Sequence, residues 1–316
     1  MKIECWICNS STIQRVVRLR DGSKNKINVC QDCGFEFFNS DNMEAIENNQ
    51  FEDLRLGSAG LKIPDIEQDF NNGYNQSEQY IMKYIDSESK QMEVLEVGCS
   101  WGYFLSKLKE KNINCIGVEK NPVRQKYVED ITGLRCYNDL IKVEGKNINF
   151  DKIFMFYTLE YISNPLNYIK RLIKLLKPNG QIIIYTPNLS DVLKDSWNNQ
   201  AFNKFFYEKQ TIGYYTLESI RCLIEKVKNK DISYRLSTEQ GYSFYNHLSW
   251  YLTNKPKSTG IVSGDNFTNE IISTFKQNND IEQSLKGLIL KFDNEYKKAV
   301  EKFKSGNRII LIIDKK

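Results

Sequence analysis

The sequence has 316 residues, more than one domain usually contains, so we expect one large core with additions. Its 44 basic and 40 acidic residues give a balanced net charge of +4. No apolar run approaches the length of a membrane span, and the start of the sequence lacks the apolar region of a signal peptide. The composition therefore predicts a soluble, cytoplasmic protein without a membrane span.

Four cysteines near the N-terminus have the spacing of a structural zinc site. Cys5 and Cys8 form one Cys-x-x-Cys pair, and Cys30 and Cys33 form a second pair after a predicted hairpin. Each pair brackets a tight turn that can present two thiolates to one tetrahedral ion, and four cysteines leave no open position for catalysis. We therefore expect residues 1–40 to form a zinc ribbon, with a redox-active dithiol or unligated cysteines as the alternatives.

The next segment, residues 41–74, differs in composition from the ribbon. Residues 41–70 contain eight acidic residues against Arg55 and Lys62, and a Gly-Ser-Ala-Gly stretch marks a loop or hinge among them. We expect this segment to be either a lid that folds over the active site or a solvated connector. Apolar residues then recur at helical spacing, so the main domain is expected over residues 75–316.

A glycine turn organises this main domain. Residues 94–97 are predicted to form a buried strand, and the apolar positions after Gly102 predict a helix. Strand, glycine turn and helix open a doubly wound fold, in which a ligand binds over the turn. A dinucleotide site is not expected, because Ser100 and Tyr103 replace the second and third glycines of its Gly-x-Gly-x-x-Gly pattern. The next apolar run ends in Glu119, whose carboxylate can accept both hydroxyls of a ribose.

The Glu-x-Gly-x-x-x-Gly spacing resembles motif I of the class I S-adenosylmethionine-dependent methyltransferases. The order of predicted elements from 92 to 188 is similar to that family element by element. The resemblance implies an α/β, doubly wound, Rossmann-like sheet of seven strands and S-adenosylmethionine as the cofactor. The residues that it implies for cofactor binding are Glu96, Gly98, Cys99, Ser100, Gly102, Glu119, Asn138, Asp139 and Tyr157.

Two insertions are expected to form a cap, near residues 189–215 and near residues 240–304. Their aromatic rings suit a sugar substrate, or they pack the cap onto its own domain. Short segments, including Pro187-Asn188, are similar to methyltransferases encoded with surface-polysaccharide genes, and four-cysteine ribbons are found fused to sugar methyltransferases. The resemblance therefore implies a small-molecule substrate, namely a sugar, a nucleotide sugar or a surface glycan.

Methyl transfer to an oxygen also requires the acceptor to lose a proton, which favours a nearby general base. Glu160, Tyr161 and Asp191 follow strands at the expected carboxyl edge, and His247, the only histidine, lies in the second insertion. Many relatives that act on small molecules carry histidines where this sequence has Tyr157 and Tyr161. We predict His247, Glu160 and Tyr161 as catalytic residues, with a structural role as the alternative for His247.

Other functions remain open from the sequence. The ribbon could serve an RNA methyltransferase, but its charge is nearly balanced and an acidic segment follows it, so nucleic acid is not the expected partner. Methyl transfer to nitrogen or carbon of another small molecule is a further alternative. A scaffold without activity is disfavoured, because the glycine turn and both of its carboxylates are intact. The sequence leaves the oligomeric state open.

Overall fold

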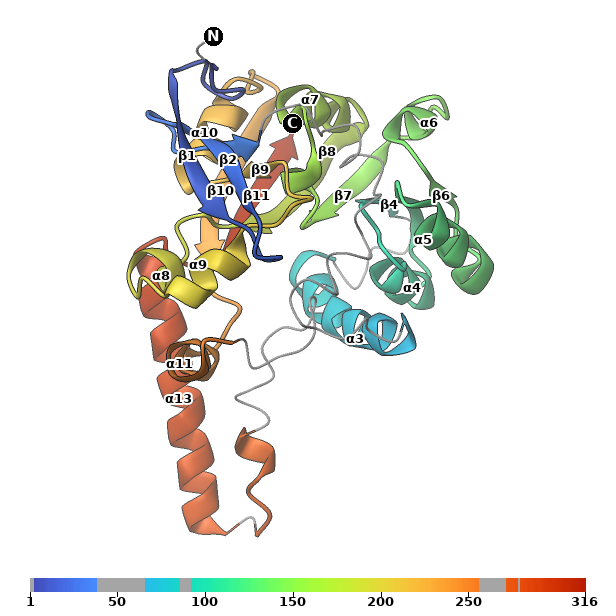
Figure 1. The fold of residues 1–316 in the computed structure, drawn as a ribbon. Helices are drawn as coiled ribbons and strands as arrows, with labels where there is room; N and C mark the ends of the chain where they lie inside the picture. Colours follow the sequence, from blue (N-terminus) through green and yellow to red (C-terminus); the bar gives the residue numbers. More distant parts are fainter. Residues whose placement is uncertain (1–2, 39–65, 86–91, 256–270, 278) are drawn as a thin grey trace.

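The computed structural model describes residues 3–38, 66–85, 92–255, 271–277 and 279–316 (Figure 1). The greater part of the predicted lid, residues 41–65, lies outside the described residues, and so do residues 256–270 of the second predicted insertion. Helix α3 (Ile66–Tyr84) begins within this segment, well before the predicted helical start at residue 75.

A seven-stranded mixed sheet forms the centre of the molecule, as predicted. Its strands are β4 (Glu93–Val97), β5 (Asn114–Val118), β6 (Cys136–Tyr137), β7 (Phe150–Phe156), β8 (Leu176–Pro187), β10 (Ile232–Glu239) and β11 (Arg308–Lys315). They lie in the order β10-β11-β8-β7-β4-β5-β6. Strands β6, β5, β4, β7 and β8 are parallel, whereas β11 runs antiparallel to both of its neighbours. This is the predicted Rossmann-like methyltransferase fold.

Helices cover both faces of this sheet (Figure 1). Apolar side chains of α3 and α4 pack on one face, and those of α7 and α10 pack on the other. Successive residues of β7 serve opposite faces, with Ile153 and Met155 on the α7 side and Phe154 on the α3 side, as the strand period of two requires. The other helices are α4 (Tyr103–Glu110), α5 (Pro122–Tyr127), η2 (Val128–Thr132), α6 (Leu140–Glu144), η3 (Leu159–Tyr161), α7 (Pro165–Lys174), α8 (Val192–Asp195), α9 (Gln200–Phe206), α10 (Leu217–Glu225), α11 (Phe244–Thr253) and α13 (Asp280–Lys302).

The N-terminal ribbon shares a second sheet with the methyltransferase part of the chain. Strands β1 (Thr12–Arg18), β2 (Lys24–Cys30) and β3 (Glu36–Phe38) are joined by β9 (Gly213–Tyr214), in the order β1-β2-β3-β9. The Phe35 ring lies 4.9 Å from that of Tyr215, and Thr216, which caps α10, donates to the carbonyl of Cys33 at 2.7 Å. The ribbon expected over residues 1–40 therefore packs against the main core and shares a sheet with it.

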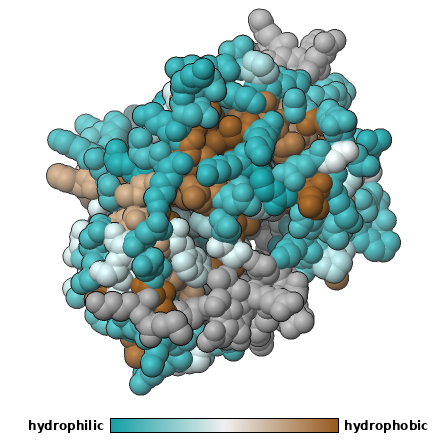
Figure 2. Space-filling model, turned by 90° about the horizontal axis from the view of Figure 1, so that it is seen from above, coloured by the Kyte–Doolittle hydropathy of each residue, from teal (hydrophilic) through white to brown (hydrophobic). Residues whose placement is uncertain are grey.

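The distal part of the molecule consists of α11 and α13, which project away from the sheet (Figure 1). The aromatic rings of the cap pack largely on one another: Trp250 contacts Phe202 and Phe205, and Trp197 contacts Phe244. Hydrophilic residues dominate the described part of the face seen from above, with hydrophobic residues in smaller areas between them (Figure 2). Among the described helices, none is long and apolar enough to cross a membrane.

Candidate cofactor and metal sites

The glycine turn follows β4 in a backbone conformation that favours glycine. Gly98, Ser100 and Gly102 have φ angles of 77°, 51° and 79°. A Cβ atom at Gly98 would collide with the side chain of Thr158, and one at Gly102 would lie 3.0 Å from Val128. The glycines are thus required by the chain's own packing as well as by its backbone angles, and not only by the approach of a ligand.

Glu119 lies at the end of β5 directly beside this turn. Its two carboxylate oxygens accept hydrogen bonds from the backbone N–H groups of Ser100 at 2.8 Å and of Asn121 at 2.9 Å. The side chain is buried, so its position is fixed before any ligand arrives. Glu119 and Ser100, which were predicted from separate parts of the sequence, are therefore in direct contact.

Glu96 is the second carboxylate of the turn, and it is 2% exposed. Burial, followed by the charge of Glu119, raises the pKa of Glu96 well above its ordinary value. Its Oε2 atom has no hydrogen-bond partner among the described residues. An unsatisfied buried acceptor is costly unless something pairs with it, so Glu96 fits a site that is completed by a polar ligand or its water. Together, Glu96 and Glu119 give the turn hydrogen-bond acceptors that suit the polar groups of S-adenosylmethionine.

The remaining predicted cofactor residues differ in their exposure and in their contacts. The Cys99 thiol faces the core, where its Sγ lies 3.5 Å from that of Cys136, so only its backbone is left for a ligand. Asn138 and Asp139 are exposed after β6, and Asp139 caps α6 by accepting from the N–H of Ile141 at 2.8 Å. One contact was missed: Arg124 donates to Ser100 Oγ at 3.1 Å, and its guanidinium lies 5.0 Å from the Trp101 ring.

Tyr157 lies after β7, next to the residue that touches Gly98, and it has a φ angle of 48°. Bulky residues rarely adopt this conformation, and such outliers concentrate at functional sites. The Tyr157 side chain is 37% exposed, and its hydroxyl accepts a hydrogen bond from Arg308 at 3.2 Å. Arg308 also donates to Tyr80 at 3.3 Å and pairs with Glu239. Sequence analysis missed Arg308, although the start of the last strand was a signal that it would lie at this edge.

The predicted catalytic residues do not form one constellation. Glu160 is buried and accepts from the hydroxyl of Thr186 at 3.0 Å, and Tyr161 is half-buried beside it. Asp191 caps α8 by accepting from the N–H of Leu193 at 2.7 Å, and burial raises the pKa of Asp191 to about 7. These three residues follow the ends of β7 and β8, and Glu160 and Asp191 are each held by a local hydrogen bond.

His247 lies in α11, fully buried within the cap. Its Nδ1 atom is 2.6 Å from the Tyr296 hydroxyl, and its Nε2 atom is 3.3 Å from the amide nitrogen of Gln240. Burial lowers the pKa of His247 to about 3. An imidazole with both nitrogens engaged and no exposed surface lacks the access that a general base needs. The arrangement corresponds to the structural alternative and not to the predicted catalytic role.

The four ribbon cysteines form one cluster. Their Sγ atoms all lie within 4.8 Å of one another, with Cys5 3.7 Å from Cys33 and Cys8 3.3 Å from Cys30. Tetrahedral zinc with Zn–S bonds of about 2.3 Å requires sulfur separations of roughly 3.8 Å, so the thiols fit such an ion. Cys5 and Cys30 also accept backbone N–H groups at 3.4 Å, which would stabilise thiolates.

Similarity to known proteins agrees with this geometry. A family model described as a methyltransferase domain matches residues 73–228. A tRNA U34 carboxymethyltransferase from Nautilia profundicola is 28% identical over 163 residues, which are 49% of this chain and 52% of that protein. The chain therefore spans about half the length of that curated relative.

Two solved structures give further comparisons. A SAM dependent methyltransferase from Archaeoglobus fulgidus is 18% identical, with a TM-score of 0.45 and coverage of 79% of this chain and 97% of that one. The plantazolicin methyltransferase BamL, in complex with a triazolic desmethylPZN analog and S-adenosylhomocysteine, is 14% identical, with a TM-score of 0.47 and coverage of 86% and 99%. Residues 73–228 therefore match a methyltransferase domain, and the strand order is that of the Rossmann-like methyltransferase fold.

Proposed function

We propose that this protein transfers a methyl group from S-adenosylmethionine to a hydroxyl of a sugar, a nucleotide sugar or a surface glycan. The cofactor supplies an activated methyl group, so the chain has mainly to hold the acceptor against it. In the proposal, Glu119 and the turn at residues 98–102 bind the cofactor. The polar end of the cofactor supplies the hydrogen-bond donor that Glu96 lacks. The four cysteines hold one structural zinc ion.

The observation that carries the proposal is the polar group beside the cofactor turn. The hydroxyls of Tyr157 and Tyr80 share the Nη1 of Arg308, and Glu239 accepts from Arg308 and, at 2.5 Å, from Lys83. Phenol, guanidinium and carboxylate groups can donate to and accept from neighbouring hydroxyls, which suits a polyhydroxylated acceptor. Tyr157 and Lys83 are the exposed members of this group, and we assign Tyr157 the orientation of the acceptor because it lies next to the glycine turn.

The identity of the base is a separate part of the proposal. Glu160 and Tyr161 remain the proposed candidates, because they follow β7 directly after Tyr157. Use of either residue requires a local shift, since Glu160 is bonded to Thr186. His247 is not part of this proposal.

RNA is the second candidate substrate, and the observation that favours it is the sequence similarity to a tRNA U34 carboxymethyltransferase. Against it, the ribbon packs the rings of Phe35 and Phe37 into the protein core, where they cannot stack on bases. A small acceptor therefore has the stronger support.

The test is a methyl-transfer assay with the full chain and S-adenosylmethionine labelled in its methyl group. Nucleotide sugars, free sugars, a polysaccharide extract and bulk tRNA are offered separately. We expect label in a carbohydrate fraction, and loss of that label in Glu119→Ala. Label in tRNA alone would replace the proposed substrate with RNA.

A further inference from the structure

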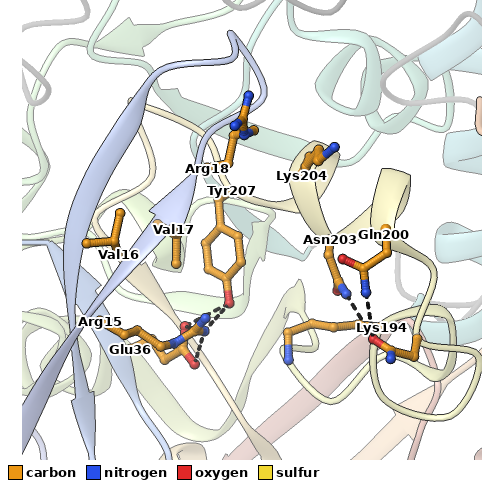
Figure 3. A pocket seen from close by; sticks show the side chains of 11 residues that line it. Arg15, Val16, Val17, Arg18, Glu36, Lys194, Gln200, Asn203, Lys204 and Tyr207 are labelled. Carbon is orange, nitrogen blue, oxygen red and sulfur yellow. Dashed lines mark hydrogen bonds and ion pairs between the residues drawn. The ribbon is translucent and has the colours of Figure 1, made fainter.

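A cavity of about 530 Å³ lies between the ribbon hairpin and the start of the cap, apart from the glycine turn. Strand β1 forms one wall, and α8 and α9 form the other (Figure 3). Its volume is within the range of roughly 300–1,000 Å³ that small-molecule sites occupy. No residue of the glycine turn or of the cysteine cluster lines it, so it is a candidate site for another ligand.

The charge of this cavity is strongly uneven. Arg15, Arg18, Lys194 and Lys204 line it, against Glu36 as the single lining carboxylate. Glu36 is already neutralised, because both of its oxygens lie 2.7 Å from Arg15 Nη2 and Oε2 accepts from the Tyr207 hydroxyl at 2.9 Å (Figure 3).

Two of the four cations are available to a ligand. Lys194 pairs with Asp195 at 3.0 Å, and Arg15 is held by Glu36. Arg18 and Lys204 are exposed, and within the described parts of the chain neither has an ion-pair partner. The cavity therefore attracts anions.

Amide side chains give the cavity a second kind of recognition group. Gln200 and Asn203 donate to the Oδ1 of Asn198 at 3.3 Å and 3.5 Å. The Oδ1 atom of Asn203 is buried and has no hydrogen-bond partner among the described residues. A buried acceptor without a donor is costly, so a side-chain rotation that turns this oxygen toward a donor in the cavity would be favourable.

The cavity walls are tied together before any ligand binds. The N–H of Arg20, in the turn after β1, donates to the carbonyl of Tyr207 at 2.8 Å, and its Nε donates to that of Phe205 at 2.7 Å. Its guanidinium lies 3.7 Å from the Phe205 ring centroid and pairs with Glu208. A preformed site loses less entropy on binding than a flexible one.

We propose that this cavity binds the diphosphate and nucleoside of a small nucleotide ligand. Arginine and lysine supply the donors that phosphate oxygens prefer, and the amides read the polar edge of a base or a ribose. An extended polyanion such as RNA needs a basic surface longer than this one cavity. Because α8 follows the carboxyl end of β8, the cavity lies on the acceptor side of the sheet. Its use as a handle for a nucleotide-sugar acceptor rests on the proposed function.

The test is calorimetric titration of the full chain with UDP, dTDP, GDP and ADP in parallel, with the four nucleosides as phosphate-free controls. We expect at least one diphosphate to bind and its nucleoside to bind roughly tenfold or more weakly, because charged hydrogen bonds are lost. The double variant Arg18→Glu/Lys204→Glu reverses two exposed charges and should lose roughly tenfold or more in affinity. The matched control, Lys170→Glu/Lys226→Glu, changes exposed lysines on α7 and after α10 and should bind normally.

Each outcome decides the proposal. No binding of any diphosphate, or equal binding by the charge-reversed variant, overturns it. A single-stranded RNA oligonucleotide that binds more tightly than every diphosphate, and is lost in the same variant, also overturns it in favour of RNA. The proposed function fails separately: diphosphate binding without methyl transfer to any carbohydrate retains the cavity and rejects the acceptor. Carbohydrate methylation at an unchanged KM in the charge-reversed variant retains the function and rejects the cavity.

Discussion

Glu119 shows how a single side chain is prepared for a ligand. Both of its oxygens accept backbone N–H groups, so its carboxylate is held in place at no cost during binding. We predict that Glu119→Ala weakens binding of S-adenosylhomocysteine by about 1.5–3 kcal/mol, the range for a hydrogen bond to a charged group. Calorimetry measures this loss, with Glu129→Ala, an exposed glutamate on η2, as the control.

The variant also leaves the N–H groups of Ser100 and Asn121 without that acceptor. Its thermal midpoint should therefore be measured beside its affinity, so that a loss of folding is separated from a loss of binding. Unchanged affinity in folded Glu119→Ala would remove this residue from the cofactor site.

His247 is a buried titratable residue, and its protonation affects the stability of the fold. The Gln240 side-chain oxygen accepts from the N–H of Asn307 at 3.0 Å, which directs its NH₂ group to the ring Nε2 of His247. The imidazole is therefore held neutral. In the unfolded chain the pKa of histidine is about 6.5, whereas burial lowers the pKa of His247 to about 3 in the folded chain.

Between these pH values the unfolded chain binds a proton that the folded chain excludes, so stability falls as pH decreases from about 6.5 toward 3. We predict that His247→Gln flattens this part of the stability curve, by up to about 1.4 kcal/mol per pH unit, and leaves binding of S-adenosylhomocysteine intact. Urea unfolding at several pH values measures the slope. Tyr296→Phe keeps the titrating ring and should keep the slope; an unaltered slope in His247→Gln would contradict the assignment.

At the scale of elements, the ribbon is coupled to the main sheet through β9. Glu36 pairs with Tyr214, and Phe37 pairs with Gly213. Disorder in the ribbon would therefore leave strand β9 of the methyltransferase part without its partner strand β3. Cys33 is central to this coupling, because its carbonyl accepts from Thr216.

We predict that Cys33→Ser loses bound zinc and lowers the melting temperature of the whole protein by more than about 10 °C, since structural zinc contributes many kcal/mol to folding. Metal analysis of protein purified without added zinc, together with circular dichroism, measures both effects. Cys222→Ser, a half-buried cysteine outside the cluster, should change neither. A metal-free wild-type protein with a folded ribbon would reject the zinc site.

Elements with a long apolar pattern were predictable, whereas strand β9 was not. The strands near residues 94, 115, 150, 182 and 308 and the ribbon hairpin were found, because alternating or continuous apolar runs mark them. Strand β9 has two residues, and its pairing with β3 depends on tertiary packing that no local pattern encodes. The early start of α3 was missed because polar residues fill its first turns.

At the scale of the whole molecule, the sequence predicted the cofactor side of the site better than the acceptor side. Gly98 and Glu119 are linked by a spacing that the fold imposes, so one motif located both. Arg308 and Tyr157 are far apart in the sequence and meet only because β11 runs antiparallel beside β8. The aromatic cap suggested a sugar site, but many of its rings pack against one another, which weakens that argument and leaves the polar edge and the basic cavity as better guides.

The central claim is that the turn between β4 and α4 binds the methyl donor. The most direct measurement is a calorimetric titration of the 316-residue chain with S-adenosylhomocysteine, which the site should bind without turnover. The account predicts saturable binding of one molecule per chain. Absence of saturable binding to the folded protein would contradict it.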